Sequence, residues 1–485
     1  MPNTAPHVLL VTADHWPAAL LGCAGHPSIR TPTIDHLARN GVRFTRAYTE
    51  CPVCIPARRT LLTGMTPRTH GDRSFIVDLP MPDAPTIAQA FREAGYQATA
   101  VGKLHVYPPR ARAGFDEVLL CEEGRPQYGP TDDYEIYLGD VGLTGQQFLH
   151  GMSNNDYVHR PWHLAEEHHP TNWTTRQMAR AVQRRDPTRP GFWYLSYTHP
   201  HPPLVPPQVY LDMYREVDPG APFHGEWPRS RDTMPMRMNN RLIESEHYTA
   251  EFIRDVRRAF YALCTHIDHQ LRVVLGTFRE EGLLDNTIVC FLADHGDMLG
   301  NHDLWAKRLY YEYSAGVPMV LAGVKGCQRV GVRRTDDRLV ALADVTPTLL
   351  DLAGVEIPST VDGLSMVGPR RRQHLYGEYG EGLEATRMLH DGRYKLIYYA
   401  AGNRGQLFDL REDPLELVDL IDSPEHEPIR RRLTDALTAE LYGDDRTWVE
   451  GGRLVGLPED STPSPPDRNL SLQRGSHWPV PPQSG

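Results

Sequence analysis

The sequence predicts an α/β protein in which a large, mostly parallel sheet is sandwiched by helices and is followed by a smaller C-terminal α+β subdomain. Short apolar runs alternate with amphipathic stretches over roughly the first 370 residues, a pattern typical of parallel strands joined by helices. Several of these runs end in acidic, cationic or imidazole residues. Ligand sites in such sheets lie at the carboxyl ends of the strands, so this edge is where we expect a functional site.

The individual elements follow from local patterns. Residues 8–11 form a continuous apolar run that suits a buried parallel strand, with Asp14 and His15 just after it. A helix at 86–94 is expected because Thr86 is a good N-cap and a glycine follows the last helical residue. The other expected elements are a helix at 33–40 and strands at 42–45, 97–101, 192–197 and 287–292.

The chain is expected to divide into a large domain and a small one. Residues 1–370 form the α/β domain, and within it 122–175 is a long insertion rich in Gly, Asp, Asn, His and Trp. Residues 371–448 form the C-terminal subdomain, with antiparallel strands at 394–399 and 406–410 and a final helix. This change of pattern predicts a small antiparallel sheet beside the large parallel one.

Residues 449–485 are expected to form a Pro-rich tail, because the runs of proline and polar residues fit neither helix nor strand. The sequence allows two interpretations of this tail. It is either disordered, or it docks on a neighbouring subunit through the apolar Trp478 and builds a homo-oligomer.

Composition excludes several classes of partner. The formal net charge is -11, which offers no basic footprint for nucleic acid and no general attraction to an anionic membrane. No apolar run approaches the roughly 20 residues of a membrane span, and the first residues lack a secretory leader pattern. Seven cysteines are an odd number and do not suggest a disulfide framework. The expectation is a cytoplasmic protein with reduced cysteines.

Lysine is strongly depleted in favour of arginine. The chain has only four lysines, which are Lys103, Lys307, Lys325 and Lys395. A compact ammonium is not interchangeable with a planar guanidinium, so each lysine is a candidate for a specific task.

Cys54 has the most specific surroundings in the chain. Pro56 and Arg58 follow it at fixed offsets, and Leu-Leu-Thr-Gly closes the segment at residue 64. The pattern places a thiol at the positive end of a helix beside a permanent cation, where an anion would bind. Cys51 and Cys54 also form a Cys-x-x-Cys pair, which alone would fit a redox site or half of a zinc site.

Two acidic strand ends suggest a divalent cation. Asp14 and His15 follow the first strand, and Asp294 and His295 follow a late one, so the two pairs can converge. Carboxylates with some imidazole suit calcium, magnesium or manganese better than a thiolate zinc site. Each pair alone is as well explained by hydrogen bonding at a strand end, and only their combination favours a metal.

Cationic and imidazole residues suggest an oxyanion site. Lys103 and His105 alternate after a strand and can face one cavity. His201 lies between prolines, and Lys307 follows the second acidic pair. Together with Arg58 they would supply donors for a tetrahedral oxyanion.

At these motifs the sequence resembles the sulfatase family, within the alkaline phosphatase superfamily. The similarity runs over nearly the whole chain, and the cysteine motif is its most specific part. Other matching segments are 25–27, 31–35, 102–105, 200–203, 294–296, 344–350 and 409–414. The resemblance implies an alkaline phosphatase-like sheet and hydrolysis of a sulfate monoester, which is a small anionic substrate, to alcohol and inorganic sulfate.

The resemblance assigns Cys54 the central role. In the family, a formylglycine-generating enzyme oxidises this cysteine to formylglycine, whose hydrate is the nucleophile. One hydroxyl of the hydrate attacks sulfur and the alcohol leaves, and the second hydroxyl helps to expel sulfate while the aldehyde forms again. Cys54, not Cys51, has Pro and Arg at the required offsets.

The same resemblance distributes the remaining roles. It implies that Arg58 holds the hydrate, that Lys103 and Lys307 bind sulfate oxygens, and that His105 orients the nucleophile. His201 would contact the sulfate and protonate the leaving oxygen. The implied metal, calcium first and manganese or magnesium as alternatives, would be bound by residue 54 and four others: Asp14, His15, Asp294 and His295.

Three positions depart from the family pattern. Ala57 stands where serine is usual, and His15 stands where a second aspartate or a glutamine is usual, which affects metal ligation. Phe75 lies roughly where phosphonate monoester hydrolase relatives carry asparagine, and those relatives lack the Lys-x-His pair found at Lys103 and His105. The last difference favours sulfate monoesters.

Two alternatives remain beside the sulfatase hypothesis. The first is a phosphonate monoester hydrolase or phosphodiesterase on the same scaffold, and the second is a non-catalytic binding protein with Cys51 and Cys54 as a redox pair. The alcohol part of the substrate is open among carbohydrate, choline-like alkyl and aryl groups. Aromatic and polar residues of the insertion either line a pocket or simply pack; they are Tyr134, Trp162, His168, His169, Asn172 and Trp173.

Overall fold

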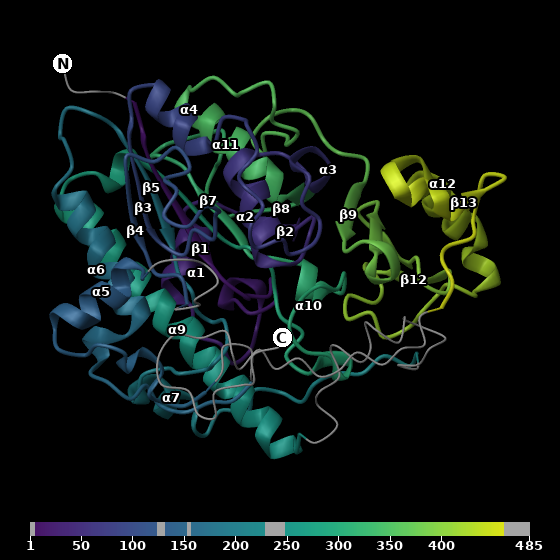
Figure 1. Ribbon diagram of the computed structural model, residues 1–485, viewed down its shortest axis with the longest axis horizontal. Coiled ribbons are helices and arrows are strands. Elements are labelled where there is room, and N and C mark those ends of the chain that lie inside the picture. The colour runs from purple at the N-terminus through teal and green to yellow at the C-terminus, as the bar shows by residue number, and fades with distance from the viewer. Residues whose placement is uncertain (1–4, 124–130, 153–156, 228–247, 460–485) are drawn as a thin grey trace.

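The computed structural model describes residues 5–123, 131–152, 157–227 and 248–459. Its centre is an eight-stranded mixed sheet with the order β4-β3-β5-β1-β6-β7-β2-β8 (Figure 1). Only β7 runs antiparallel to its neighbours. The strands are β1 His7–Ala13, β2 Val42–Tyr48, β3 Gln97–Gly102, β4 Glu117–Leu120, β5 Gly191–Ser196, β6 Thr287–Ala293, β7 Met319–Ala322 and β8 Arg334–Ala341.

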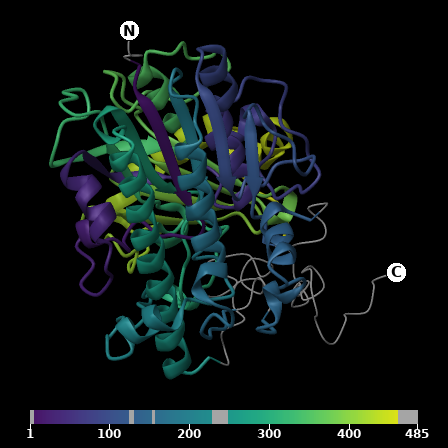
Figure 2. The same ribbon diagram turned by 90° about the vertical axis from the view of Figure 1, so that its left-hand side faces the viewer.

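Helices cover both faces of this sheet. On one side α1, α6 and α9 pack against one another, and on the other side α2, α4 and α11 do so (Figures 1 and 2). The predicted sandwich is therefore confirmed. The helices are α1 Pro32–Arg39, α2 Cys54–Thr63, α3 Pro67–His70, α4 Ile87–Glu93, α5 Asp133–Asp140, α6 Pro170–Gln183, α7 Gln208–Tyr214, α9 Ala250–Glu280, α10 Glu312–Ala315, α11 Val345–Ala353 and α12 Glu427–Glu440.

The local patterns that predicted these elements have direct structural counterparts. The Thr86 hydroxyl caps α4 by accepting a hydrogen bond from the Gln89 N–H at 3.2 Å. Strand β1 is buried along almost its entire length, as expected for a central parallel strand. Strand β4 was not predicted, because it has only four residues and its first, Glu117, is exposed.

The register of the central strands aligns their carboxyl ends. Ala13 of β1 is level with Ala293 of β6, so Asp14 and Asp294 leave the sheet side by side. Gly102 of β3 is level with Ser196 of β5. Its φ is 109°, and a Cβ there would lie 1.8 Å from the Ser196 carbonyl oxygen, so only glycine allows this close approach just before Lys103.

A smaller unit follows the large sheet. It contains a four-stranded antiparallel sheet with the order β12-β11-β10-β9, and α12 packs against β10 and β11 (Figure 1). Its strands are β9 Leu375–Tyr379, β10 Thr386–His390, β11 Tyr394–Tyr399 and β12 Arg404–Asp409. Lys395 of β11 is fully buried and pairs with Glu312 and Glu416, each at 2.7 Å, which joins this sheet to α10 of the large unit.

The first residues of the expected tail belong to this packed unit. Val449–Glu450 (β13) pairs with Arg453–Leu454 (β14), and Val449, Leu454 and Leu457 pack against the core beside α12. The expected boundary at residue 449 is therefore too early, because apolar side chains continue to pack beyond it. Trp478 and the docking role expected of it lie outside the described residues.

No helix among the described residues is both long enough and apolar enough to cross a membrane.

Candidate active site

Cys54 is the first residue of α2, at the carboxyl edge of the large sheet. Val53 before it is extended, with φ -154°, and all ten residues of α2 are buried. The Cys54 Sγ lies 3.1 Å from His295 Nε2 and 3.7 Å from Asp14 Oδ1. The sulfur lies at a helix N-terminus, as the motif predicted, and it meets the ends of β1 and β6 there.

Arg58 lies one turn further along α2 and is held from three directions. Its Nε donates to Asp294 Oδ2 at 2.9 Å, and its Nη1 donates to the Lys103 carbonyl at 2.9 Å and to Ser196 Oγ at 2.8 Å. Burial alone would lower the pKa of Arg58, but Asp294, Tyr194 and Asp14 are among the neighbours that together raise this pKa above its ordinary value. The guanidinium is therefore a fixed cation beside Cys54.

Lys103 lies between two carboxylates. Its Nζ donates to Asp14 Oδ2 and to Glu123 Oε1, and the ammonium has no exposure to solvent. Burial alone would lower the pKa of Lys103, but Asp14 and Glu123 raise it well above its ordinary value. His105 is buried two residues later with φ 58°, and its ring meets Phe75 edge-on, with 6.2 Å between the ring centroids.

His15, His201 and Lys307 also lie close together in the site. Lys307 Nζ lies 2.5 Å from His15 Nε2, and the centroids of the His15 and His201 rings are 4.3 Å apart. His201 Nδ1 donates to the Pro202 carbonyl at 2.6 Å, so Nε2 is left to face Glu123 Oε1 at 3.8 Å. Burial lowers the pKa of His201 to about 3, so without a bound anion its ring is neutral.

A set of donor atoms suits a divalent cation. One atom each from Asp14, His15, Cys54 and His295 lie within 4.8 Å of one another, and all four residues are buried. Asp294, the fifth expected ligand, is not in this set; its Oδ2 accepts from Arg58 Nε at 2.9 Å and its Oδ1 accepts from the His295 N–H at 2.9 Å. A carboxylate with two imidazoles fits a metal site chemically.

The profile of the family described as Sulfatase matches residues 6–355 of this chain, which contain every residue of the site. The chain belongs to the sulfatase family. A second profile, described as N-sulphoglucosamine sulphohydrolase, C-terminal, matches residues 300–442.

Individual sulfatases match over nearly the full length. The chain is 33% identical over 472 residues to an arylsulfatase from Clostridium perfringens, covering 93% of this chain and 98% of that one. It is 29% identical over 446 residues to a choline-sulfatase from Rhizobium meliloti, covering 87% and 84%. The fold also matches a phosphonate monoester hydrolase from Agrobacterium radiobacter with a TM-score of 0.76, at 23% identity and coverage of 92% and 98%.

Within this sulfatase site, several residues were not predicted from the sequence. Asp297 Oδ2 lies 2.7 Å from His15 Nδ1 and so directs the other ring nitrogen towards the site. Glu122 and Glu123 follow β4 and contact the Lys103–His105 segment. The sequence pattern that could have identified Glu122 and Glu123 is the apolar run at 118–121. This run is followed by two acidic residues, just as the predicted strands are followed by polar residues.

Cys51 lies outside the chemistry of the sulfatase site. It has no exposure to solvent, and it belongs to a core cluster with Tyr310. Burial raises the pKa of its thiol well above the ordinary value. Both Cys51 and Cys54 are free thiols. This arrangement therefore gives no support to the hypothesis that Cys51 and Cys54 form a redox pair.

A small cavity adjoins Glu123 and His201 on the side of the insertion. Its volume is about 40 Å³, and Phe148, His150 and Trp162 contribute to its walls. Of the insertion residues considered for a pocket, Trp162 lines this cavity. Tyr134 and Trp173 instead pack together in a core cluster.

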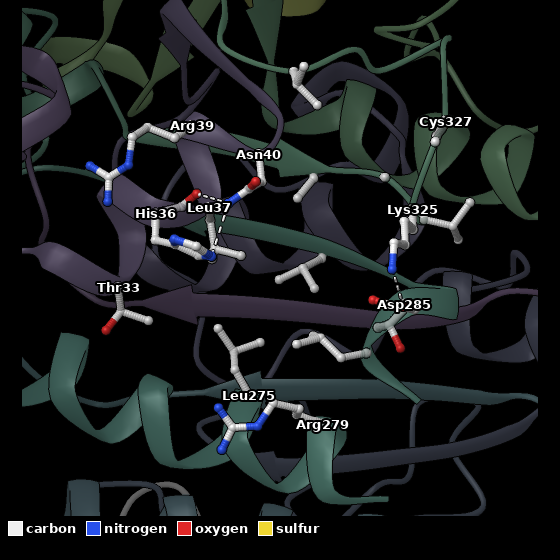
Figure 3. A pocket seen from close by; sticks show the side chains of 18 of the residues that line it. Thr33, His36, Leu37, Arg39, Asn40, Leu275, Arg279, Asp285, Lys325 and Cys327 are labelled. Carbon is white, nitrogen blue, oxygen red and sulfur yellow. Dashed lines mark hydrogen bonds and ion pairs between the residues drawn. The ribbon is translucent and has the colours of Figure 1, made fainter. Parts of the chain in front are cut away.

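A larger groove lies elsewhere, between α1, the C-terminal end of α9 and the segment after β7 (Figure 3). Its volume is about 930 Å³, with Leu37 and Leu275 in its lining and Lys325 paired to Asp285 at 2.8 Å. The residues of the sulfatase site do not line it. Size alone therefore does not identify the active site, whereas the convergence of strand ends does.

Proposed function

We propose that the protein hydrolyses a sulfate monoester to an alcohol and inorganic sulfate, with residue 54 as the nucleophile after its oxidation to formylglycine. The observation that carries the proposal is the position of Cys54. It begins a buried helix, next to Arg58 and among the donor atoms of Asp14 and His295. This arrangement supports a nucleophile held beside both an oxyanion site and a cation site.

Maturation requires a partner. We expect a formylglycine-generating enzyme to act on Cys54 before or during folding, because the thiol of the folded chain is only 2% exposed. In its hydrated form, residue 54 supplies a hydroxyl that displaces the alcohol from sulfur. The other steps depend on residues already in place around it.

The cationic side chains bind and orient the sulfate group. Lys103 and Lys307 would hold the sulfate oxygens, and His105 would orient the hydrate of residue 54. Arg58, fixed by Asp294 and Ser196, would neutralise charge at the nucleophile. These groups are arranged before the substrate arrives, which is the condition for strong electrostatic stabilisation of a transition state.

His201 is the expected proton donor to the leaving oxygen. Its Nε2 faces the site, and the negative charge of bound substrate would raise the pKa of the imidazole. We expect calcium at Asp14, His15, residue 54 and His295, where it would polarise a sulfate oxygen, with manganese or magnesium as alternatives.

The test compares three ester classes on one preparation. The chain is produced with a formylglycine-generating enzyme and assayed with 4-nitrophenyl sulfate, 4-nitrophenyl phosphate, and a phosphodiester or phosphonate monoester. The proposal expects the highest kcat/KM for the sulfate and no turnover by Cys54→Ala. A preference of several orders of magnitude for the diester or phosphonate would instead favour the activity named for the structural relative from Agrobacterium radiobacter.

A further inference from the structure

Two neighbouring loops at the edge of the large sheet hold one another in place. The first follows β3 and carries Lys103 and His105. The second follows the edge strand β4 and carries Glu122 and Glu123. Strands β3 and β4 pair in parallel, and the Cys121 N–H donates to the Gly102 carbonyl at 3.1 Å, so the two loops leave the sheet together.

Glu122 makes the central contact between these loops. Its Oε1 accepts hydrogen bonds from the Leu104 N–H at 2.7 Å and from the His105 N–H at 2.8 Å. Leu104 and His105 are buried, with 1% and 6% exposure, so these two donors have little access to water. A buried N–H without a partner is energetically costly, which makes the carboxylate oxygen a strong constraint on this loop.

The loop needs such a constraint because its backbone is unusual. His105 has φ 58°, a left-handed conformation that is unfavourable for a non-glycine residue. The conformation turns the chain so that Lys103 and His105 both stay buried at the site. Hydrogen bonds to consecutive N–H groups fix the orientation of the peptide planes on both sides of Leu104.

Glu122 is itself held by the insertion. Its N–H donates to Asp132 Oδ2 at 2.6 Å, and the other oxygen of Asp132 caps α5 by accepting from the Glu135 N–H at 2.8 Å. Asp133 accepts from the Leu120 N–H at 2.7 Å. The N-terminus of α5 thus supports the loop that supports Lys103.

We propose that Glu122 is a positioning residue for Lys103, the expected sulfate ligand, and for His105, the residue expected to orient the nucleophile. It acts through the main chain of residues 104 and 105, whereas its neighbour Glu123 contacts the Lys103 ammonium directly. The proposal rests on the proposed function, in which Lys103 binds a sulfate oxygen and His105 orients the nucleophile. Displacing such groups by about 1 Å can cost about 100-fold in rate.

The chain provides a matched control for this residue. Asp268 of α9 is also buried, and its carboxylate accepts from the consecutive N–H groups of Thr33 and Ile34, at 3.0 and 2.8 Å. It makes the same kind of contact at the start of α1. Asp268 has no part in the candidate site.

The experiment measures two properties of Glu122→Ala, Glu122→Asp, Glu122→Gln and Asp268→Ala. The first is kcat/KM for 4-nitrophenyl sulfate, and the second is the Kd for inorganic sulfate by calorimetry, which does not depend on turnover. Glu122→Ala and Glu122→Asp should lower kcat/KM by about 10- to 100-fold and weaken sulfate binding by about tenfold, because neither side chain reaches both N–H groups. Glu122→Gln should keep most of the wild-type kcat/KM and most of the wild-type sulfate affinity, since its amide oxygen can accept the same hydrogen bonds.

Asp268→Ala should lower the melting temperature and leave kcat/KM and the sulfate Kd of the folded protein unchanged. Wild-type sulfate affinity in Glu122→Asp, or equal losses in Glu122→Asp and Glu122→Gln, would overturn the positioning role. If Glu122→Ala does not fold, the difference in kcat/KM and in sulfate Kd between Glu122→Asp and Glu122→Gln still tests the positioning role. Wild-type protein that binds sulfate and hydrolyses no ester would contradict the proposed function alone, and the binding measurements would still test Glu122.

Discussion

Arg58 and Asp294 form a buried ion pair at the centre of the site, with 2.9 Å between Arg58 Nε and Asp294 Oδ2. Neither side chain is exposed beyond 1%. Arg58 belongs to the helix that begins at Cys54, and Asp294 follows strand β6. The pair therefore fixes the helix of the nucleophile to the sheet edge that carries the candidate metal ligands.

Removing Arg58 should affect both stability and activity. Arg58→Ala leaves the Asp294 carboxylate buried without its partner, which should lower the free energy of unfolding by about 3–5 kcal/mol. Arg58→Lys keeps the charge but loses the fork that reaches Asp294 and Ser196 together, and should lower kcat/KM by about 100-fold or more. Urea unfolding and sulfate ester turnover measure the two effects. Wild-type turnover by Arg58→Lys would contradict the role given to the guanidinium.

Replacing His201 should slow the hydrolysis of esters with poor leaving groups most. A general acid contributes about 10²- to 10⁴-fold when the departing oxygen is basic, and much less when it leaves as a stable anion. His201→Asn should therefore lose far more kcat/KM with an alkyl sulfate than with 4-nitrophenyl sulfate. Rates with both esters, for wild type and variant, give the ratio. Equal losses for the two esters would assign the proton to another residue, such as Lys307.

Metal binding should stabilise the folded chain measurably. A ligand present at 100 times its Kd adds about 2.7 kcal/mol to the free energy of unfolding. Calcium, manganese and magnesium are added separately to chelator-treated protein, and the melting temperature is followed with no substrate present. At least one of these ions should raise the melting temperature of the wild-type protein, and this rise should be absent in the Asp14→Asn variant. An equal rise in the variant would place the ion elsewhere.

Stability should also depend on buried imidazoles away from the site. His266 and His169 are fully buried, with 4.7 Å between ring centroids, and burial lowers the pKa of both well below its ordinary value. The unfolded chain binds their protons below about pH 6.5 and the folded chain does not, so stability falls as pH drops through this range. His266→Phe should reduce the slope of unfolding free energy against pH by up to about 1.4 kcal/mol per pH unit below about pH 6.5.

The control for this measurement is His36→Asn, because His36 lies exposed on α1. Its removal should leave the slope as in the wild type. Urea unfolding at a series of pH values gives the slopes directly. An unchanged slope in His266→Phe would show that the folded chain already accommodates this proton.

Much of the fold and site was predictable because the parallel strands end in chemistry-bearing residues. Asp14, Lys103 and Asp294 each follow an apolar run, and the pairing register places those runs level with one another. Cys54 was predictable from Pro56 and Arg58, since their spacing fixes a helix N-terminus. These signals are local in sequence, so no knowledge of tertiary packing was needed.

Other parts depend on packing that no local pattern reveals. Asp294 directly precedes His295, yet Asp294 pairs with Arg58 and His295 faces Cys54. The two partners differ because the two side chains leave the end of the strand in different directions. Asp297 approaches His15 only because the 296–308 loop folds back with several left-handed residues. Glu122 and Glu123 escaped prediction because their strand has four residues.

Residue 54 of the active protein should carry an aldehyde and no longer a thiol. Peptide mass spectrometry at residue 54, on preparations converted to different extents and each assayed for sulfate release, tests this. Specific activity should rise in proportion to the converted fraction and be zero without conversion. Full activity in a preparation whose residue 54 is unmodified cysteine would contradict it.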